Sequence, residues 1–517
     1  MIKTIIISLI LFTSLNATKY VNRDATGTGT GDSWTNAYAS LDQIEWAEVS
    51  AGDTIYVSGG SDSTVYRTKY TGFADGLNTV VKDAPYITYA SGNPVVICKS
   101  WEANHNGDVY LMTMGSTQAY LFHTKGISNI EFNGIKFYDL RTSWSGYSGL
   151  LYIGGGDTGD IDSMQIFKNC EIVGLGQGTL IYTAGSEVVY QNCLIRQTYN
   201  ELEWDQDPFG FSSGRGGYII DNCRIEYLVN DLVGGEDAHR DVLQFSNYGL
   251  NARHEVVRIQ ISNNIILQPY ENVNWTGIIY SSTPQTATDW YIYNNIFYSN
   301  NTSDGVTPIY LNQPDITNAN RMSVHLLNNT FIINSEVDGS STPIAIAGGD
   351  DVNTDFGVDT IICKNNLVVT RAPVNIFLNL RIMYPAGVYY RDFDYNIYAE
   401  HGGISGNFTN GEGFGNFSYR QWKSGSLDTT EAIIYDVHSD TMNATLVSFT
   451  DEGGTDIADY YSTTGRDRGV DLSAEYPFLA TDILGNPRSG TWDCGALEYQ
   501  GTVGTPTRVR MRQIIIQ

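Results

Sequence analysis

The stretch Phe167-Lys168-Asn169-Cys170-Glu171-Ile172 carries a pattern that recurs along most of this chain. An apolar residue and any residue are followed by Asn, then Cys or Asn, any residue and a second apolar residue. The pattern returns at residues 190–195, 220–225, 261–266, 292–297, 326–331 and 363–368, and variants at residues 132–137 and 393–398 open and close the series. Such a recurrence predicts a repeat architecture in which each repeat contacts its neighbours.

The central Asn of the pattern, or Gly134 in the first copy, marks a sharp bend, because Asn and Gly best tolerate a positive φ. The next residue then points inward, and successive coils stack these residues into one column. Its members are Cys170, Cys193, Cys223, Asn264, Asn295, Asn329, Asn366 and Asn396. Stacked Asn side chains satisfy one another's amide groups, and the Cys positions predict small buried thiols in place of a disulfide framework.

A second set of short apolar strands follows the bends and predicts another inward column. Its strands are residues 149–152, 179–182, 208–211, 241–244, 277–280, 308–311, 343–346 and 375–378, with the second residue of each pointing inward. Coils of 23 to 41 residues with three short strands each predict a single-stranded right-handed parallel β-helix. Nine or more coils at about 4.8 Å give a rod of roughly 40 Å.

The first residues predict export. Lys3 precedes an apolar run over residues 5–15, and Ala17 offers a cleavage site, which together are typical of a signal peptide over residues 1–17. No later run is long enough to span a bilayer. The net charge of −27 disfavours nucleic acid and anionic membranes as partners, and favours solubility or divalent cations. We expect a secreted, extracellular or cell-surface protein, the periplasm being an alternative.

Both ends of the chain resemble secreted right-handed β-helix proteins of the pectate-lyase-like group. The N-terminal resemblance lies in residues 20–34, an expected helix from Ser40 to Val49, and Ala51-Gly52-Asp53-Thr54-Ile55-Tyr56-Val57. The C-terminal resemblance lies in residues 418–422 and in Asp482-Ile483-Leu484-Gly485-Asn486-Pro487-Arg488, followed by Asp493-Cys494-Gly495-Ala496-Leu497-Glu498. The resemblance implies the fold and export, and a group that includes lyases, glycosidases and surface proteins.

The resulting organisation has four parts after the signal peptide. We expect an N-terminal helical cap with the first coils over residues 18–110, the β-helix over 111–400, a β-rich C-terminal cap over 401–501 and a tail over 502–517. The tail, with Arg508, Arg510 and Arg512, departs from the resemblance.

Two acid-rich loops on successive coils form the candidate site. One contains Trp204, Asp205 and Asp207, and the next contains Glu236, Asp237, His239, Arg240 and Asp241. Because neighbouring coils lie about 4.8 Å apart, the loops should be adjacent. The turns after the following strands add Arg215, Arg253 and His254, with Gln244 on the strand between.

Three interpretations of this site remain open. A lyase would use His239, Arg240 or a tyrosine as base, with Arg215, Arg240 or a Ca²⁺ ion neutralising a uronate carboxylate. We assign Asp207 and Asp241 to the catalytic set, and Asp205, Asp207, Glu236 and Asp237 to the Ca²⁺ ligands. A glycosidase would use two of these carboxylates, about 5.5 Å apart for retention or about 6.5–9.5 Å for inversion. A non-catalytic adhesin or tailspike-like protein needs neither.

Motifs of named relatives are missing. Asn353-Thr354-Asp355 follows Asp350-Asp351, the reverse of the polygalacturonase-like order, and the Arg-x-Pro-x-x-Arg of pectate lyases is absent. The sequence also lacks P-loop, HExxH, CxxC and nucleophile-elbow patterns, so redox cofactors and zinc are not expected.

Aromatic residues provide candidates for sugar contact. Tyr152, Tyr182, Phe211 and Tyr280 share a predicted strand position interrupted by Gln244, and alternation favours packing inside the core. Trp101, Trp144, Trp204 and Trp275 lie in predicted loops, and Trp204 lies inside an acidic loop. We assign Trp204, Arg253, His254 and Gln244 to substrate binding, with an extracellular acidic polysaccharide as the expected partner and a polysaccharide lyase as the expected activity.

Overall fold

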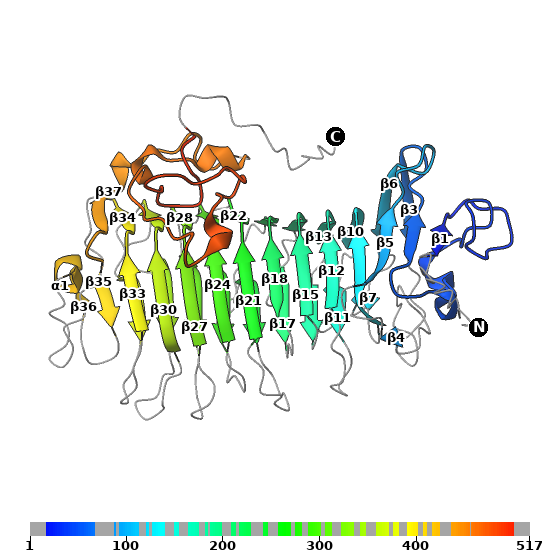
Figure 1. The fold of residues 1–517 in the computed structure, drawn as a ribbon, viewed down its shortest axis with the longest axis horizontal. Coiled ribbons are helices and arrows are strands. Elements are labelled where there is room, and N and C mark those ends of the chain that lie inside the picture. Colours follow the sequence, from blue (N-terminus) through cyan, green and yellow to red (C-terminus); the bar gives the residue numbers. More distant parts are fainter. Residues whose placement is uncertain are drawn as a thin grey trace, which may run out of the picture.

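The Asn-centred bends divide each coil into short strands, and in this computed structural model the strands stack into three long sheets (Figure 1). The structure describes residues 17–67, 87–88, 93–112, 120–123, 127–139, 149–154, 164–174, 181–184, 187–198, 208–212, 217–228, 241–246, 257–269, 275–281, 288–300, 306–312, 322–334, 342–347, 358–371, 376–381, 390–401, 407–410, 416–423, 436–454 and 456–500. Within these residues the strands of every sheet pair in parallel, except the last pair of the third sheet, which is antiparallel.

Each sheet is named here by its strands, in spatial order. Sheet 1 contains β1 (Thr18–Val21), β2 (Thr54–Val57), β5 (Val95–Lys99), β9 (Ile130–Asn133), β12 (Met164–Lys168), β15 (Glu187–Gln191), β18 (Tyr218–Asp221), β21 (Val257–Ser262), β24 (Thr288–Tyr293), β27 (Met322–Leu327), β30 (Val358–Lys364) and β33 (Tyr390–Asp394). Sheet 2 contains β3 (Ser63–Arg67), β6 (Asp108–Met112), β10 (Ile135–Asp139), β13 (Glu171–Gly174), β16 (Leu194–Gln197), β19 (Arg224–Tyr227), β22 (Ile265–Gln268), β25 (Ile296–Ser299), β28 (Thr330–Ile333), β31 (Leu367–Thr370), β34 (Ile397–Glu400) and β37 (Asp440–Asn443).

Sheet 3 lies between the end of each sheet 2 strand and the start of the next sheet 1 strand. It contains β7 (Tyr120–His123), β11 (Gly149–Gly154), β14 (Ile181–Ala184), β17 (Phe209–Ser212), β20 (Asp241–Ser246), β23 (Trp275–Ser281), β26 (Val306–Asn312), β29 (Ile344–Ala347), β32 (Ile376–Arg381), β35 (Asn407–Asn410) and β36 (Asn416–Phe417). A two-stranded pair joins β4 (Ile87–Thr88) to β8 (Ile127–Ser128). This is a right-handed parallel β-helix, as predicted.

The rod is longer than the recurring bends alone indicated. Sheets 1 and 2 each contain 12 strands in the described residues, which corresponds to about 53 Å at a spacing of 4.8 Å. The recurring pattern did not reveal the first coils, because the links before β3 and β6 do not carry the Asn-centred sequence pattern of the later bends.

The bends adopt the predicted conformation. Positive φ values of 52° to 58° occur at the central bend residues Asn169, Asn192, Asn222, Asn263, Asn294, Asn328, Asn365 and Tyr395, and Gly134 has a φ of 70°. The following residue points inward in each coil and is at most 2% exposed. We call these inward residues the inner column.

Hydrogen bonds join the Asn members of the inner column. The Asn295 backbone N–H donates to Asn329 Oδ1 at 3.0 Å, and Asn295 Nδ2 donates to both Asn329 Oδ1 and the Ile261 carbonyl. The same bonds recur from Asn264 to Asn396. All six cysteines are buried, free thiols, and burial raises the pKa of Cys170 and Cys223 well above the usual value.

The inward column of sheet 3 differs from the prediction by one residue in some coils. The register aligns Leu151, Ile181 and Leu243 with the buried Phe209, Ile278, Ile309 and Ile344. The prediction placed Leu150, Leu180 and Val242 there, and it placed Ile376 where the register has Leu378. The two registers were hard to distinguish because adjacent residues are both apolar, and both Leu150 and Val242 are themselves buried.

The prediction that the four aromatic residues share one strand position is therefore wrong. The register places Tyr152 beside Tyr182, then Gly210 and Gln244, whereas Phe211 lies beside Thr183 and Phe245. Phe211 and Phe245 stack inside the rod with ring centroids 4.3 Å apart.

Short helices accompany the two ends of the rod. The helix expected from Ser40 to Val49 is two single-turn 3₁₀ helices, η1 (Leu41–Gln43) and η2 (Trp46–Glu48), which bury Leu41 and Trp46. Beyond β34 the chain has β35, β36 and β37 together with α1 (Tyr419–Lys423), η3 (Ala444–Leu446), η4 (Ile457–Tyr460), η5 (Thr463–Gly465) and η6 (Pro477–Leu479). None of the helices in the described residues has the length and apolarity needed to cross a membrane.

Residues 444–454 and 456–500, the C-terminal segment, follow β37 and fold back along the rod. In Figure 1 this orange-to-red segment lies over the edge where sheets 1 and 2 meet. Ile483 and Leu497 pack on Ile265 and Ile296 of sheet 2, and Leu472 and Trp492 pack with Leu327 of sheet 1. The outward side chains of these later coils are apolar because the C-terminal segment packs on them.

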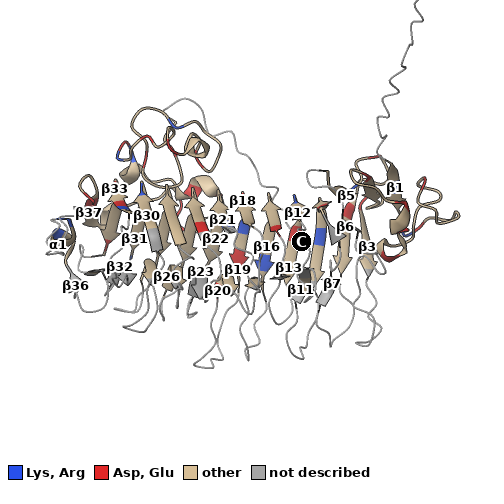
Figure 2. Cartoon of the chain, turned by 60° about the horizontal axis from the view of Figure 1, so that its bottom comes forward, with Lys and Arg blue, Asp and Glu red and all other residues tan. Residues whose placement is uncertain are grey.

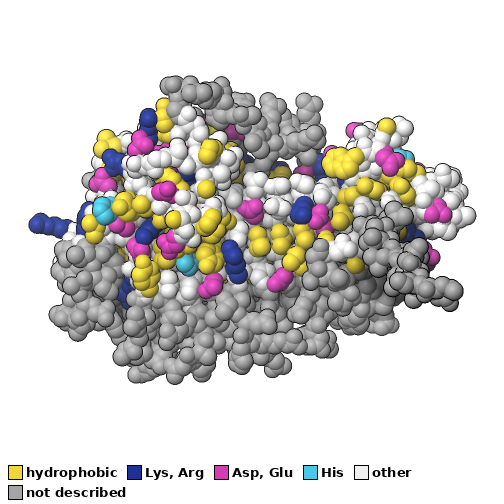
Figure 3. Space-filling view, viewed as in Figure 1, with side chains coloured by type: hydrophobic (Ala, Val, Ile, Leu, Met, Phe, Trp, Pro, Cys, Tyr) yellow, Lys and Arg dark blue, Asp and Glu magenta, His cyan; other side chains and the backbone are white. Residues whose placement is uncertain are grey.

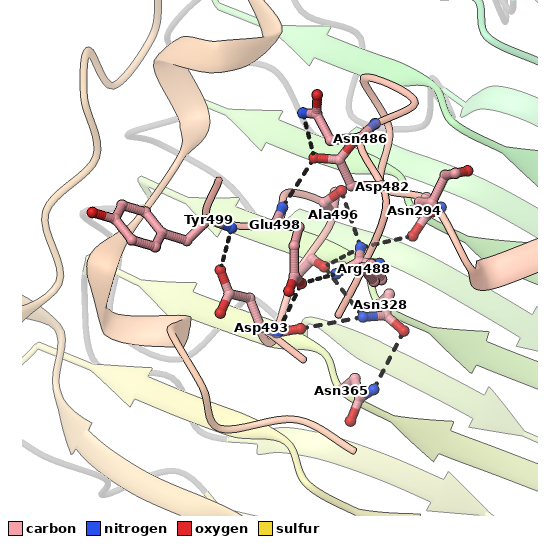
Figure 4. A network of polar contacts seen from close by, with 12 residues as sticks. Asn294, Asn328, Asn365, Asp482, Asn486, Arg488, Asp493, Ala496, Glu498 and Tyr499 are labelled. Atoms are coloured by element: carbon pink, nitrogen blue, oxygen red, sulfur yellow. Dashed lines mark hydrogen bonds and ion pairs between the residues drawn. The ribbon is translucent and has the colours of Figure 1, made fainter. Parts of the chain in front are cut away.

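A buried ion network holds the C-terminal segment together and to the rod (Figure 4). Arg488 donates to Glu498 at 3.0 Å, to Asn294 Oδ1 at 3.0 Å, and to two backbone carbonyls of the segment. Asp482 accepts the backbone N–H of Glu498 at 3.0 Å. The motif that suggested a family resemblance therefore has a structural role here.

Candidate functional site

The two loops singled out by sequence connect sheet 2 to sheet 3 on neighbouring coils. One runs from β16 to β17 and the other from β19 to β20. β16 pairs with β19 through Leu194 and Arg224, and β17 pairs with β20 through Phe209 and Leu243. The strands that flank the two loops therefore pair at both ends, and the predicted adjacency of the loops themselves lies outside the described residues.

Most of the predicted site residues lie outside the described residues. These are Trp204, Asp205, Asp207, Arg215, Glu236, Asp237, His239, Arg240, Arg253 and His254, and their roles stay predictions. The described chain shows where their segments attach. Residues 199–207 and 229–240 enter one end of β17 and β20, and residues 213–216 and 247–256 leave the other end.

Asp241 and Gln244 are the predicted site residues that the structure describes. Asp241 begins β20 and its side chain is buried, whereas Gln244 is half-buried on the outer face, between the inward Leu243 and Phe245. Gln244 Nε2 lies 3.5 Å from Asp241 Oδ2. The neighbouring position on β17 is Gly210, which adds no side chain beside Gln244.

The predicted Ca²⁺ site has no described counterpart. The ligands Asp205, Asp207, Glu236 and Asp237 lie outside the described residues, and within the described ranges no group of three or more His, Cys, Asp or Glu residues is arranged to hold a metal ion. Ca²⁺ binding stays a prediction.

Sequence reasoning missed a row of charged residues on the outer face of sheet 2 (Figure 2). Lys136 of β10 contacts Asp108 at 2.8 Å and Glu171 at 3.5 Å, and Tyr138 donates to Glu171. Burial lowers the pKa of Lys136, but its contacts with Asp108 and Glu171 outweigh burial and raise that pKa above the usual value. Lys136 is therefore a fixed cation at neutral pH.

The row ends in two arginines that share one carboxylate. Glu226 of β19 contacts Arg196 of β16 at 2.5 Å and also Arg224 of its own strand. Burial raises the pKa of Glu226, but the charge of Arg224 and the hydrogen bonds from both arginines outweigh it, so the pKa lies below its usual value. Two guanidinium groups therefore lie beside one carboxylate on this face of the rod.

The arginine pair adjoins the predicted site. β16 and β19 are the strands from which the loops at residues 199–207 and 229–240 depart. The strands that lead into the loops thus carry the two guanidinium groups. Part of this charged row could have been predicted from the repeat. One outward column of sheet 2 consists of the residues two positions after each bend, which are Lys136, Glu171, Leu194 and Arg224.

A separate polar pocket lies at the C-terminal end of the rod. Tyr395, Lys423, His438, Asp440 and Arg468 are among its lining residues. The His438 ring stacks on Tyr395 with centroids 4.6 Å apart, and its Nδ1 lies 2.7 Å from Asp394 Oδ2. Many coils separate this pocket from the predicted loops.

Comparisons with known proteins add little to this geometry. No family model matches the chain, and no curated protein matches it. Among solved structures, the crystal structure of pectate lyase Pel9A is similar at 16% identity, over 94% of this chain and 98% of that chain, with a TM-score of 0.46. At this level of likeness, the fold rests on the strand pairing of this chain itself.

Proposed function

We propose that this chain is an exported enzyme that depolymerises an acidic, uronate-containing polysaccharide by β-elimination. One observation carries the proposal: the strands flanking the two acid- and base-bearing loops pair at both ends, at β16 with β19 and at β17 with β20. Residues near 205 and near 240, distant in sequence, thus belong to neighbouring coils of a rigid rod. Such a scaffold with variable loops is a common setting for catalysis.

The chemistry assigns a role to each predicted residue. His239 or Arg240 removes the proton beside the uronate carboxylate, and the electron pair left behind expels the glycosidic oxygen of the neighbouring sugar. Arg215, or Ca²⁺ held by the loop carboxylates, stabilises the charge that develops on the carboxylate. Trp204, Gln244, Arg253 and His254 bind the flanking sugars.

The charged row of sheet 2 supports an anionic substrate. Arg196 and Arg224 lie where the loops leave sheet 2, and Lys136, which is paired with Asp108 and Glu171, lies further along the row. Guanidinium groups beside the loops are suited to bind the carboxylates of such a polymer.

Incubation with a panel of uronate polymers tests the proposal. Elimination leaves an unsaturated sugar, which absorbs in the near ultraviolet, and we expect that absorbance to rise. New reducing ends without that absorbance would indicate a glycoside hydrolase instead. Neither signal, together with retained binding, would indicate a non-catalytic glycan-binding protein.

Substitutions test the residue assignment separately. We expect His239→Ala or Arg240→Ala to abolish product formation without changing the thermal unfolding temperature, because loop residues contribute little to the rod. His401→Ala and Arg420→Ala are matched controls, since both side chains are exposed at the far C-terminal coils, and these should retain activity. Full activity in both test variants would show that the assigned site is wrong.

A further inference from the structure

The bend residues Asn169, Asn192 and Asn222, together with Asn133 just before the bend at Gly134, form a second ladder of amides on the outside of the rod, where sheet 1 meets sheet 2. Asn169 Nδ2 donates to Asn133 Oδ1 at 2.9 Å, Asn192 Nδ2 to Asn169 Oδ1 at 3.3 Å, and Asn222 Nδ2 to Asn192 Oδ1 at 2.6 Å. We call Asn133, Asn169, Asn192 and Asn222 the open ladder. Asn169 and Asn192 are exposed, and Asn133 and Asn222 are half-buried.

The same edge further along the rod is covered by the C-terminal segment. There Asn294 and Asn365 keep ladder bonds to Asn263 and Asn328, and the bend amides also bond the segment's backbone. Asn294 Nδ2 donates to the Thr481 carbonyl at 2.9 Å, Asn328 Nδ2 to the Asp493 carbonyl at 3.3 Å, and Asn365 Nδ2 to the Val470 carbonyl at 2.8 Å. The covered amides thus show how this edge holds a polar chain laid over it.

The open ladder has the same hydrogen-bonding capacity to spare. An Asn amide has two N–H donors and an oxygen with two lone pairs, and the ladder bonds of Asn169 and Asn192 use one N–H and one lone pair of each amide. Successive rungs are spaced by about 4.8 Å because each belongs to the next coil. This regular row of polar groups suits a ligand that is itself a repeating polar chain.

An exposed tryptophan stands at the N-terminal end of the open ladder. Trp101 is 69% exposed and follows β5 at the same edge. Lys99 Nζ lies 5.9 Å from the Trp101 ring centroid, and the Lys99 side chain packs against Gly134, next to the Asn133 rung. Hydrophobic side chains gather over β5 and β6 in Figure 3.

A second indole supports this platform. Trp34 stacks on His105 with centroids 3.9 Å apart, and its Nε1 donates to Glu102 Oε2 at 2.7 Å, the residue after Trp101. Flat, partly wet aromatic faces bind sugar rings through their apolar side, while neighbouring polar groups bind the hydroxyls. A protein partner would gain less from a row of evenly spaced amides.

We infer that Trp101 and the open ladder together form a binding track for a linear polysaccharide, separate from the reacting loops. The track spans β5 to β18, four strand steps or about 19 Å, and it lies at the edge of sheets 1 and 2, whereas the loops border sheet 3. The polymer's hydroxyl and ring oxygens bond the amides, and one sugar ring lies on Trp101. The inference rests on the proposed function in taking a polysaccharide as the ligand.

Binding to soluble polysaccharides, measured by affinity electrophoresis or calorimetry on the full chain, tests the track. We expect the affinity of the unsubstituted protein to rise with ligand length up to chains that span the track. Trp101→Ala, and the double variant Asn169→Gly/Asn192→Gly, should each lose this gain, with polymer binding weakened about 2- to 10-fold for the lost ring contact. Glycine keeps the positive φ of the bends while it removes the amides.

Matched controls separate the track from general surface effects. Leu446→Ala removes another exposed apolar side chain, 71% exposed on the C-terminal segment. Asp467→Gly removes an exposed polar side chain at a φ of 55°. Both controls should bind polymer as the unsubstituted protein does.

The outcomes distinguish the two proposals. Unchanged polymer binding in both test variants would overturn the track and leave the enzyme proposal standing. Failure of the unsubstituted protein to bind or cleave any glycan of the panel would overturn both. Binding that arises only after deletion of residues 501–517 would assign the open ladder to the chain's own tail and overturn the track.

Discussion

Asparagine has two structural uses in this protein, one residue apart. At the bend it accepts a positive φ, and one position later its amide fills the inner column. The two uses explain why the Asn-Asn pair recurs in the later coils and why Cys can replace only the second Asn. A small thiol fits the inner column, but it does not favour the left-handed backbone of the bend.

The inner column predicts a graded response at Asn295. Asn295→Ala would remove the bond to the Ile261 carbonyl and leave the backbone and side-chain N–H groups of Asn264 without their acceptor. Because buried unsatisfied groups cost about 1–3 kcal/mol each, we expect a loss of about 2–4 kcal/mol, measured by chemical denaturation. Asn295→Cys, which copies the inner column at Cys193, should cost less than Ala. Equal losses would contradict a role for the residue's polar contacts.

Glu226 predicts a pH dependence with a definite sign. Its folded-state pKa is lowered, so its ion pairs stabilise the protein above the unfolded-state value of about 4.3, and this stabilisation is lost as the pH falls through the folded-state pKa. Glu226→Gln should therefore be less stable than the unsubstituted protein near pH 7, and the difference should vanish in acid. Denaturant midpoints measured across this range would show it. A pH-independent difference would contradict the assignment.

Single residues also show what the sequence could and could not predict about the site. The neighbouring coils of the two loops followed from the repeat, because Asn192 and Asn222 fix the phase of successive coils. The pairing of Arg196 with Glu226 could have been predicted in the same way, because each residue lies four positions after its bend Asn and the register places them side by side. The positions of loop residues such as His239 cannot be predicted in this way, because the loops do not follow the repeat.

At the scale of elements, the C-terminal segment is the part that sequence described least well. Its motif suggested a cap at the end of the rod, and the structure places it along the edge of sheets 1 and 2. It has little regular secondary structure beyond single helical turns. Its apolar residues therefore follow neither the helical nor the strand periodicity from which elements are predicted. Its contacts, including Arg488 with Asn294, join residues far apart in sequence.

Arg488 predicts how this segment can be detached. Arg488→Met would leave Glu498 buried without its cation, and removal of one partner of a buried pair costs about 3–5 kcal/mol. We expect faster hydrogen exchange and proteolysis across residues 456–500 and newly exposed backbone in β22 and β25. Addition of Glu498→Gln should recover part of the loss. Unchanged exchange in Arg488→Met would show that apolar packing alone holds the segment.

Sheet 3 shows a limit of a different kind. The strands containing Leu150 and Val242 were assigned to the right place, but their alternation was displaced by one residue. Both neighbours in each pair are apolar and buried, so binary pattern gives no preference between the two registers. Gly210 and Gln244 mark the outer face in two of the coils. They identify the register of the other coils only once the strand pairing is known.

At the scale of the whole molecule, the rod behaves as a stack of nearly equivalent coils, and this predicts that one coil can be removed. Deletion of residues 193–222 joins Asn192 to Cys223 and preserves the bend motif. We expect a folded rod with normal β circular dichroism but no catalytic activity, since the loop at residues 199–207 is lost.

Deletion of the preceding coil is the matched control. Removal of residues 170–192 joins Asn169 to Cys193, keeps both loops and keeps the pairing of Arg196 with Glu226. This variant should fold with lower stability, because Glu171 no longer pairs with Lys136, and it should retain activity. Loss of activity in both deletions alike would show that the loops do not act as a local pair.

The position of the C-terminal segment also sets the order in which the protein can mature. A nascent chain that has emerged as far as residue 400 contains every strand of sheet 1, yet Ile265, Ile296 and Leu327 still lack the side chains that cover them. Early coils can stack during synthesis. The later coils expose rows of apolar side chains to solvent until the C-terminal segment has been synthesised. Prematurely terminated chains are therefore expected to aggregate, because such exposed rows are aggregation-prone.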